Sequence, residues 1–227
     1  MNTDNSLRLL DADYDGAIDD DVFQCLNPLS SKSFFLYAGA GSGKTRTLVS
    51  VLTRFADQYG ELFLRKGKML GVITYTNAAC DEIMERVERC SPQFRKIFFI
   101  STIHSFCWRL IGGYSDDIRR YLLSSIPEEI NELEEKEIKG RSGTQASRDR
   151  QSKIQALQDQ LSFLSKPRRF SYNPSGNNFG RASLSHSEVI KITSEFLKRK
   201  SSMKMLVAST FPFILIDESQ DTNKTLM

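Results

Sequence analysis

The sequence lacks the features that mark membrane, secreted or disulfide-stabilised proteins. No apolar run approaches the roughly 18 residues that a membrane span needs, and the acidic start has no apolar segment of the kind that forms a secretory signal. The cysteines are widely spaced and form no Cys-x-x-Cys pair, which argues against a disulfide framework and a cysteine metal site. We therefore expect a soluble, cytoplasmic protein whose thiols are reduced. The four are Cys25, Cys80, Cys90 and Cys107.

A strong charge of one sign is also missing. The 227 residues carry a net charge of +3, so the total charge indicates no particular partner. The distribution is uneven, because residues 1–22 hold seven aspartates and only Arg8, whereas 136–169 hold nine Lys or Arg and three acids. The length suits one sizeable domain, or one domain with a large insertion.

A glycine-rich segment near the start is the most informative motif. It follows an apolar, aromatic run, 34–37, that predicts a buried strand, and it precedes apolar pairs at helical spacing. Glycines between a strand and a helix let backbone N–H groups converge on phosphate oxygens at the positive end of the helix. Lys44 would then reach the β and γ phosphates of ATP, and the Thr45 hydroxyl would hold Mg²⁺. The predicted nucleotide-binding residues here are Ala38, Gly39, Ala40, Gly41, Ser42, Gly43, Lys44, Thr45 and Arg46.

A second apolar run, 213–216, predicts a buried strand that ends in two acids. Ligands bind at the carboxyl ends of strands in open α/β sheets. We assign Asp217 to the metal and Glu218 to the attacking water. The predicted catalytic residues are thus Lys44, Asp217 and Glu218; the alternative is a strand that ends in solvated acids.

Strands and helices alternate elsewhere in the chain, which predicts an α/β fold with a parallel, doubly wound sheet. The expected strands are 69–74 and 97–100. The expected helices are 77–89, 102–111 and 187–198, and Asn77 is expected to cap the first of them. Between 113 and 183 the strand signal disappears, and a charged, helical insertion is expected. The predicted organisation has three parts. Residues 1–32 form an acidic lead-in that contains a short helix near 20–26. Residues 33–112 and 184–227 form an ATP-binding lobe, and residues 113–183 form the insertion.

Two further segments follow predicted strands, 74–79 and 101–106. Each offers hydroxyls and amides that can bind phosphate oxygens, and an aromatic residue, Tyr75 or Phe106, on which a base can stack. The alternative is structural, because Thr and Asn also cap helices and both aromatics could belong to the core.

Four segments, in this order, resemble the motifs of the UvrD/Rep/PcrA group of superfamily one helicases. They are 38–45, similar to motif I; 72–79, similar to motif Ia; 101–106, similar to motif Ib; and 214–223, similar to motif II. Tyr75 stands where the family more often has Phe, and Ser219 replaces a frequent Phe or Tyr. The resemblance implies a RecA-like P-loop NTPase core, incomplete here, that carries a helical insertion. It also implies an ATP- and Mg²⁺-dependent motor on single-stranded DNA, usually moving 3′ to 5′.

The resemblance also implies roles for further residues. Gln220 and Asp221 would couple the nucleotide site to neighbouring motifs, and Gln24 is a candidate adenine reader although its surroundings depart from the family pattern. The insertion corresponds to subdomain 1B, whose basic stretch could face DNA or could be a solvated surface. The residues implied to contact DNA are Thr74, Tyr75, Asn77, Thr102, His104 and Ser105.

The sequence ends at Met227, shortly after the segment similar to motif II. Family members continue with a second lobe, so we expect an N-terminal fragment that binds nucleotide weakly, hydrolyses it very slowly and unwinds nothing alone. A second possibility is a non-unwinding DNA-dependent ATPase, or a nucleotide-sensing subunit of a nuclease, repair or phage-defence complex. An adenylate-type kinase is disfavoured, because its acceptor site and lid have no counterpart.

Residues near the N-terminus partly match the pattern of a calcium-binding loop. Residues 11–22 match the EF-hand pattern in acids and in Gly16, but Val22 occupies the position of the final bidentate Glu. We therefore expect an acidic lead-in at this end of the chain and not a calcium site.

Overall fold

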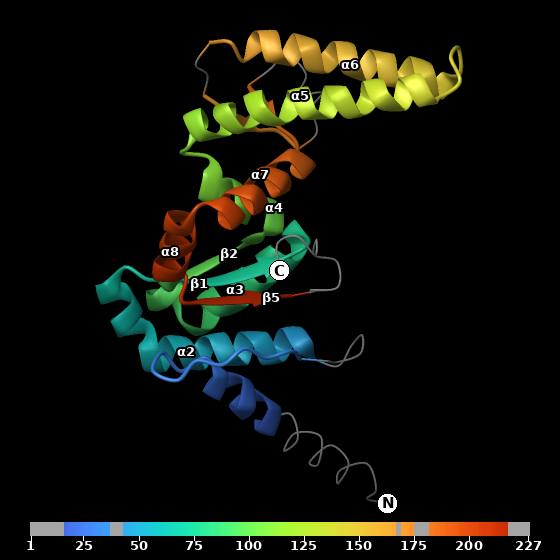
Figure 1. Ribbon diagram of the computed structural model, residues 1–227. Coiled ribbons are helices and arrows are strands. Elements are labelled where there is room, and N and C mark those ends of the chain that lie inside the picture. Colours follow the sequence, from blue (N-terminus) through green and yellow to red (C-terminus); the bar gives the residue numbers. More distant parts are fainter. Residues whose placement is uncertain (1–15, 37–42, 167–168, 175–181, 218–227) are drawn as a thin grey trace, which may run out of the picture. The chain divides into compact units, whose positions relative to one another are not determined.

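The computed structural model describes residues 16–36, 43–166, 169–174 and 182–217 (Figure 1). It separates into two compact units, residues 1–103 with 202–222 and residues 104–201 with 223–227. The expected limits of the insertion, 113 and 183, both lie inside the second unit.

Among the described residues, the first unit contains a parallel three-stranded sheet in the order β2-β1-β5. The strands are β1 (Leu70–Thr74), β2 (Phe98–Thr102) and β5 (Phe213–Ile216). Every residue of β1 is buried, as expected for the central strand of a sheet with both faces covered. The predicted parallel α/β arrangement is confirmed.

Helices α2 (Lys44–Lys66) and α3 (Asn77–Cys90), the short 3₁₀ helix η1 (Pro92–Ile97) and helix α8 (Ser201–Thr210) accompany this sheet. The apolar residues of α2 recur three and four apart, so they form one stripe that packs on the strands. This core includes Val51, Leu52, Phe55, Ala56 and Phe63 from α2, with Leu70, Val72, Phe98 and Phe213 from the sheet. Thr76, and not the expected Asn77, caps α3, because its hydroxyl accepts the N–H of Ala79.

The predicted strand before the glycine-rich segment, 34–37, is wrong for residues 34–36, which have no regular secondary structure; Tyr37 lies outside the described residues. A strand needs a neighbouring strand to satisfy its N–H and C=O groups, and neither sheet formed by the described residues includes this segment. Phe35 is 77% exposed, so its apolar character does not reflect burial.

Strand β5 forms where it was predicted, but it is not buried on both faces. Phe213 is buried, whereas Ile214 and Ile216 are 36% and 38% exposed. β5 pairs only with β1 in the described sheet, and its two isoleucines share the face that the core does not cover.

The second unit is mainly helical, as expected for the insertion. Its helices are α4 (Ile103–Ile111), α5 (Ser115–Lys139), α6 (Gln145–Phe163) and α7 (His186–Arg199). Ile118, Leu122, Ile126 and Ile130 recur every four residues along α5 and are buried. Two short strands were not predicted, β3 (Ser171–Tyr172) and β4 (Ser183–Leu184), which pair in parallel. Helix α8, which follows α7, was also not predicted.

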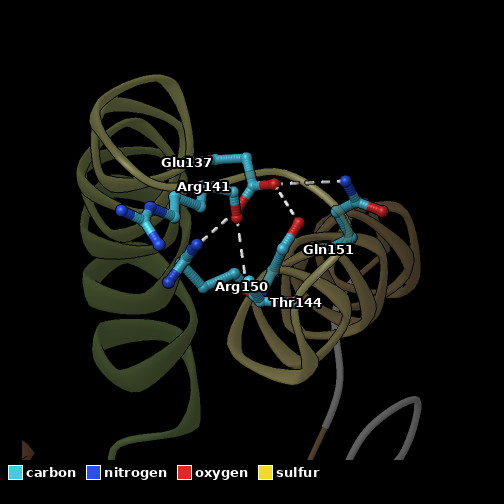
Figure 2. A network of polar contacts seen from close by, with 6 residues as sticks. Glu137, Arg141, Thr144, Arg150 and Gln151 are labelled. Carbon is cyan, nitrogen blue, oxygen red and sulfur yellow. Dashed lines mark hydrogen bonds and ion pairs between the residues drawn. The ribbon is translucent and has the colours of Figure 1, made fainter.

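A polar network joins the ends of α5 and α6 (Figure 2). The carboxylate of Glu137 accepts hydrogen bonds from the Ser147 hydroxyl, from Arg150 Nε at 2.7 Å and from Gln151 Nε2 at 3.3 Å. The Ser147 hydrogen bond and the Arg150 guanidinium hold the pKa of Glu137 below its ordinary value. The turn between the helices contains Gly143, whose φ of 74° suits glycine.

Near the N-terminus, residues 16–25 are helical, which confirms the expected short helix. This helix includes the second half of the calcium-loop pattern, and residues 11–15 lie outside the described residues. Across the described ranges, no three His, Cys, Asp or Glu side chains are grouped as a metal would require. The described helices also include none with the length and apolar composition of a membrane span.

Candidate functional site

The carboxyl ends of the three parallel strands lie side by side at one edge of the sheet. Thr74 pairs with Thr102 at the ends of β1 and β2, and Ile73 pairs with Ile216 at the end of β5. The next residue, Asp217, continues this register, because its N–H donates to the carbonyl of Ile73 at 2.8 Å. Residues of the segments similar to motifs Ia, Ib and II are thus brought together by backbone pairing.

The N-terminal end of α2 points toward the same edge. Helix α2 runs antiparallel to β5 (Figure 1), and Phe63, near its C-terminal end, stacks on Phe213 at the start of β5 with ring centroids 6.4 Å apart. Lys44 is the first residue of α2 and therefore lies at the end of the helix that β5 approaches with Asp217.

The local structure at the start of α2 suits an anion. Gly43 caps the helix with φ 82°, a left-handed conformation that glycine adopts at little cost. The first turn contains no acidic residue that would offset the positive end of the helix dipole. Lys44 and Thr45 are partly exposed there. An ammonium, a hydroxyl and the carboxylate of Asp217 are the groups that a magnesium-bound triphosphate requires.

The other predicted nucleotide residues differ in their positions. Arg46 is exposed on the first turn of α2, and Gln24 is exposed on the helix formed by residues 16–25. The remaining ones lie outside the described residues: Ala38, Gly39, Ala40, Gly41, Ser42, Glu218, Gln220 and Asp221.

The segment after β1 separates into buried and exposed side chains. Thr74 is 2% exposed, and its hydroxyl donates to the carbonyl of Thr76 and lies 2.9 Å from the Cys80 Sγ. Tyr75 is 52% exposed, and Asn77 is exposed at the first turn of α3. Thr74 therefore shapes the loop, while Tyr75 and Asn77 present their side chains to solvent.

The segment after β2 separates in a similar way. Thr102 and Phe106 are buried, so the core interpretation holds for Phe106. Ser105 is exposed, and His104 is half-buried. His104 packs against His186 with ring centroids 3.9 Å apart. Partial burial, followed by the influence of His186, lowers the pKa of His104.

Three residues near His104 were missed in the sequence. Tyr172 and His186 contact each other, and Trp108 stacks on Tyr172. Helical spacing could have placed Trp108 one turn after His104, but no sequence signal joins these residues to Tyr172 or His186, which lie more than sixty positions away.

The basic stretch 136–169, which holds nine Lys or Arg, is neutralised in part by acids of the same unit. Four of its cations form ion pairs with α5: Lys136 with Glu132, Lys139 with Glu135, Arg150 with Glu137, and Lys153 with Glu129. This pairing favours the interpretation of a solvated helical surface, because paired cations are less available to phosphates.

Comparison with known proteins identifies the family. The UvrD/REP helicase N-terminal domain matches residues 20–167, which is well over half of the chain. The chain belongs to the UvrD/REP helicase family. Helicases of this family from two bacteria match almost all of it. The ATP-dependent DNA helicase PcrA of Bacillus subtilis is 26% identical over 232 residues, covering 91% of this chain and 31% of PcrA.

A probable DNA helicase II homolog of Mycoplasma capricolum is 26% identical over 245 residues, covering 99% of this chain and 32% of that protein. The Gabija protein GajB of Bacillus cereus is 30% identical over 110 residues, covering 48% of this chain and 15% of GajB. The chain thus spans about a third of the length of these UvrD/REP-type helicases.

Proposed function

We propose that this chain is the ATP-binding lobe of an ATP-dependent DNA helicase or translocase, which couples hydrolysis to movement along single-stranded DNA. The main support is the alignment of Asp217 with the ends of β1 and β2, at the edge toward which α2 directs Lys44. Ligands of open parallel sheets bind at this edge. The low-identity match to two DNA helicases supports DNA as the substrate class.

In this proposal Lys44 neutralises the β and γ phosphates, and backbone N–H groups at the start of α2 bind phosphate oxygens. The Thr45 hydroxyl and the Asp217 carboxylate would hold Mg²⁺, which supplies charge neutralisation to the phosphates when bound. Glu218 would orient and polarise the attacking water. Tyr75 would stack on a base and Asn77 would contact the DNA backbone.

Nucleotide binding tests the proposal directly. A fluorescent ATP analogue should bind the chain in the presence of Mg²⁺, and Lys44→Ala should weaken that binding. In the whole protein, single-stranded DNA should stimulate ATP hydrolysis, and Lys44→Ala should remove the stimulation. Equal binding and hydrolysis by Lys44→Ala and the wild type would show that the phosphate contact is wrongly assigned.

The 227-residue chain should be far less active than the whole protein. Motors of this kind need two lobes that close around the nucleotide, and the proposal assigns one of these lobes to this chain. In related hydrolases, an arginine that stabilises the transition-state charge raises the rate about 10³–10⁵-fold, and in this family we expect such arginines in the second lobe. We expect weak nucleotide binding, very slow hydrolysis and no unwinding from this chain, and 3′-to-5′ movement from the whole protein.

A second candidate is a DNA-dependent ATPase or nucleotide-sensing subunit that unwinds nothing and acts with a nuclease or repair partner in a larger complex. The match to the Gabija protein GajB is compatible with it. Strand separation by the whole protein, measured with a duplex that carries a single-stranded tail, distinguishes the two. Unwinding supports the motor, and DNA-stimulated hydrolysis without unwinding supports the second candidate.

A further inference from the structure

Four rings from three separate segments form a continuous series in the second unit. The centroid of His104 lies 3.9 Å from that of His186, His186 lies 5.5 Å from Tyr172, and Tyr172 lies 6.2 Å from Trp108. We call Trp108, Tyr172, His186 and His104 the ring ladder. None of its members is fully buried, and His186 is exposed. The ladder is therefore accessible from solvent.

The local structure fixes each ring. His104 and Trp108 are four residues apart on α4 and share one face, while the neighbouring Cys107 and Ile111 are 1% and 0% exposed in the core. Trp108 also lies directly over Gly112, where an added Cβ would come within 2.9 Å of the indole ring. The indole orientation thus depends on the absence of a side chain at position 112.

The other two rings are held by backbone pairing and by a helix cap. Tyr172 pairs with the fully buried Leu184 between the short strands β3 and β4, and the Asn173 N–H donates to the Leu184 carbonyl at 3.0 Å. His186 begins α7 immediately after Ser185, whose capping box with Glu188 fixes the start of that helix. The Tyr172 hydroxyl is hydrogen-bonded to Nδ1 of His186. The ladder is therefore organised before any ligand binds.

The ladder presents planar rings more than charge. Desolvation and the neighbouring His186 lower the pKa of His104, so its imidazole is neutral at pH 7. Burial raises the pKa of the Tyr172 phenol, which also stays neutral. Ser105 and Arg109, one turn apart on α4, are exposed beside the ladder residues of that helix and carry a hydroxyl and a guanidinium. Planar rings next to such groups are the combination that recognises the bases and phosphates of a single strand.

We propose that the ring ladder is a second contact surface for single-stranded DNA, on which an unpaired base stacks, in addition to the contacts proposed for Tyr75 and Asn77. This inference rests on the proposed function. Duplex DNA is a poor ligand for the ladder because its bases already stack on one another. A metal ion is a weaker alternative, since the described residues include no three grouped metal-binding side chains.

The sequence provides a direct probe, because Trp108 is the only tryptophan of the chain. Single-stranded oligo(dT) should quench Trp108 fluorescence, and the quenching should persist in EDTA. Total DNA binding is measured separately by the anisotropy of a labelled oligo(dT). Removing a stacking ring costs about five- to a hundredfold in affinity, so we expect Tyr172→Ala to weaken binding about tenfold and to remove most of the quenching.

Three further variants serve as controls. Tyr172→Phe keeps the ring and should retain the affinity even if Tyr172→Ala folds poorly. Tyr114→Ala removes an exposed aromatic of the same unit and should change neither measurement. Tyr75→Ala should weaken binding but leave the quenching at saturating DNA unchanged.

The outcomes separate this inference from the proposed function. DNA binding by anisotropy without any change in Trp108 emission, and with full affinity in Tyr172→Ala, would overturn the ladder and leave the proposed function standing. Equal quenching by duplex DNA, or loss of quenching in EDTA, would also overturn it. Absence of any DNA binding by the wild type would overturn both.

Discussion

The N–H of Asp217 donates to the carbonyl of Ile73 at 2.8 Å, one residue beyond the end of β5. This bond joins two segments that are more than 140 positions apart in the sequence. It holds the Asp217 backbone against the central strand and thus places this residue at the edge formed by the carboxyl ends of the strands. The hydrogen bond involves the backbone only, so the side chain can be changed without removing it.

Asp217→Asn should therefore preserve the fold and impair the metal-dependent part of nucleotide binding. A charge-assisted contact contributes about 1.5–3 kcal/mol, so the affinity for a MgATP analogue should fall by about ten- to a hundredfold, and binding without Mg²⁺ should change little. Titration with the fluorescent analogue measures both. Asp57→Asn, at an exposed position of α2, is the matched control; the same loss in that variant would contradict the assignment.

Gly60→Ala should destabilise the first unit, although alanine is the better helix former by about 1 kcal/mol. Gly60 lies in the middle of α2, and a Cβ there would come within 2.5 Å of the Phe94 ring. Overpacking of this kind costs about 1–3 kcal/mol. Denaturant unfolding followed by circular dichroism should show the loss.

Two companions test the cause of that loss. Phe94→Leu in the Gly60→Ala background should recover part of the stability. Gly113→Ala, where an added Cβ meets nothing within 4 Å, should be neutral or slightly stabilising. A stable Gly60→Ala protein would mean that the ring moves aside at no cost.

The four thiols should differ greatly in reactivity. All four cysteines are free, Cys90 is exposed and Cys107 is buried. Burial raises the pKa of Cys107 to about 11, and burial also raises the pKa of Cys80. Only about one thousandth of Cys107 would be thiolate at pH 8, so it should react with Ellman's reagent only as the chain unfolds. Cys90→Ser should remove the fastest phase; a fast phase that remains intact would contradict this order.

The sequence predicted best those elements whose signal is local. Asn77–Cys90 shows an amphipathic pattern, and the helix formed within one residue of the expected limits, although Thr76 caps it and not the expected Asn77. The strands 70–74 and 213–216 were found because apolar β-branched residues are concentrated there. Asp217 could be placed at the edge because a strand directly precedes it.

Features that depend on distant partners were not predictable. Residues 34–36 have strand-like composition, yet a strand also requires a neighbouring strand, and no local pattern shows whether one is present. The two-residue strands β3 and β4 are too short to produce any periodicity. Thr74 and Tyr75 look equally suitable for DNA in the sequence, and only the folded structure shows that the Thr74 hydroxyl is buried against Cys80 while the Tyr75 ring is exposed. The ring ladder needs three segments, so no single segment indicates it.

Glu137→Gln should loosen the hairpin formed by α5 and α6. The Ser147 hydroxyl and Arg150 stabilise the charged carboxylate and lower its pKa from the ordinary value of 4.5. The folded state thus releases this proton at a lower pH than the unfolded chain does. The stabilisation is fully present above pH 4.5 and is lost as the pH falls through the lower folded pKa. At pH 7 the variant should melt at a lower temperature than the wild type, and this difference should shrink in acid.

Glu134→Gln is the matched control, because Glu134 is exposed on the same helix. It should leave the melting temperature nearly unchanged at both pH values, since a solvated carboxylate contributes little to the free energy of unfolding. Arg150→Gln should reproduce much of the Glu137→Gln effect, and the double variant should lose less than the sum of the two, because they remove the same interaction. Strict additivity of the two losses would mean that the pair shown in Figure 2 does not stabilise the hairpin as a unit.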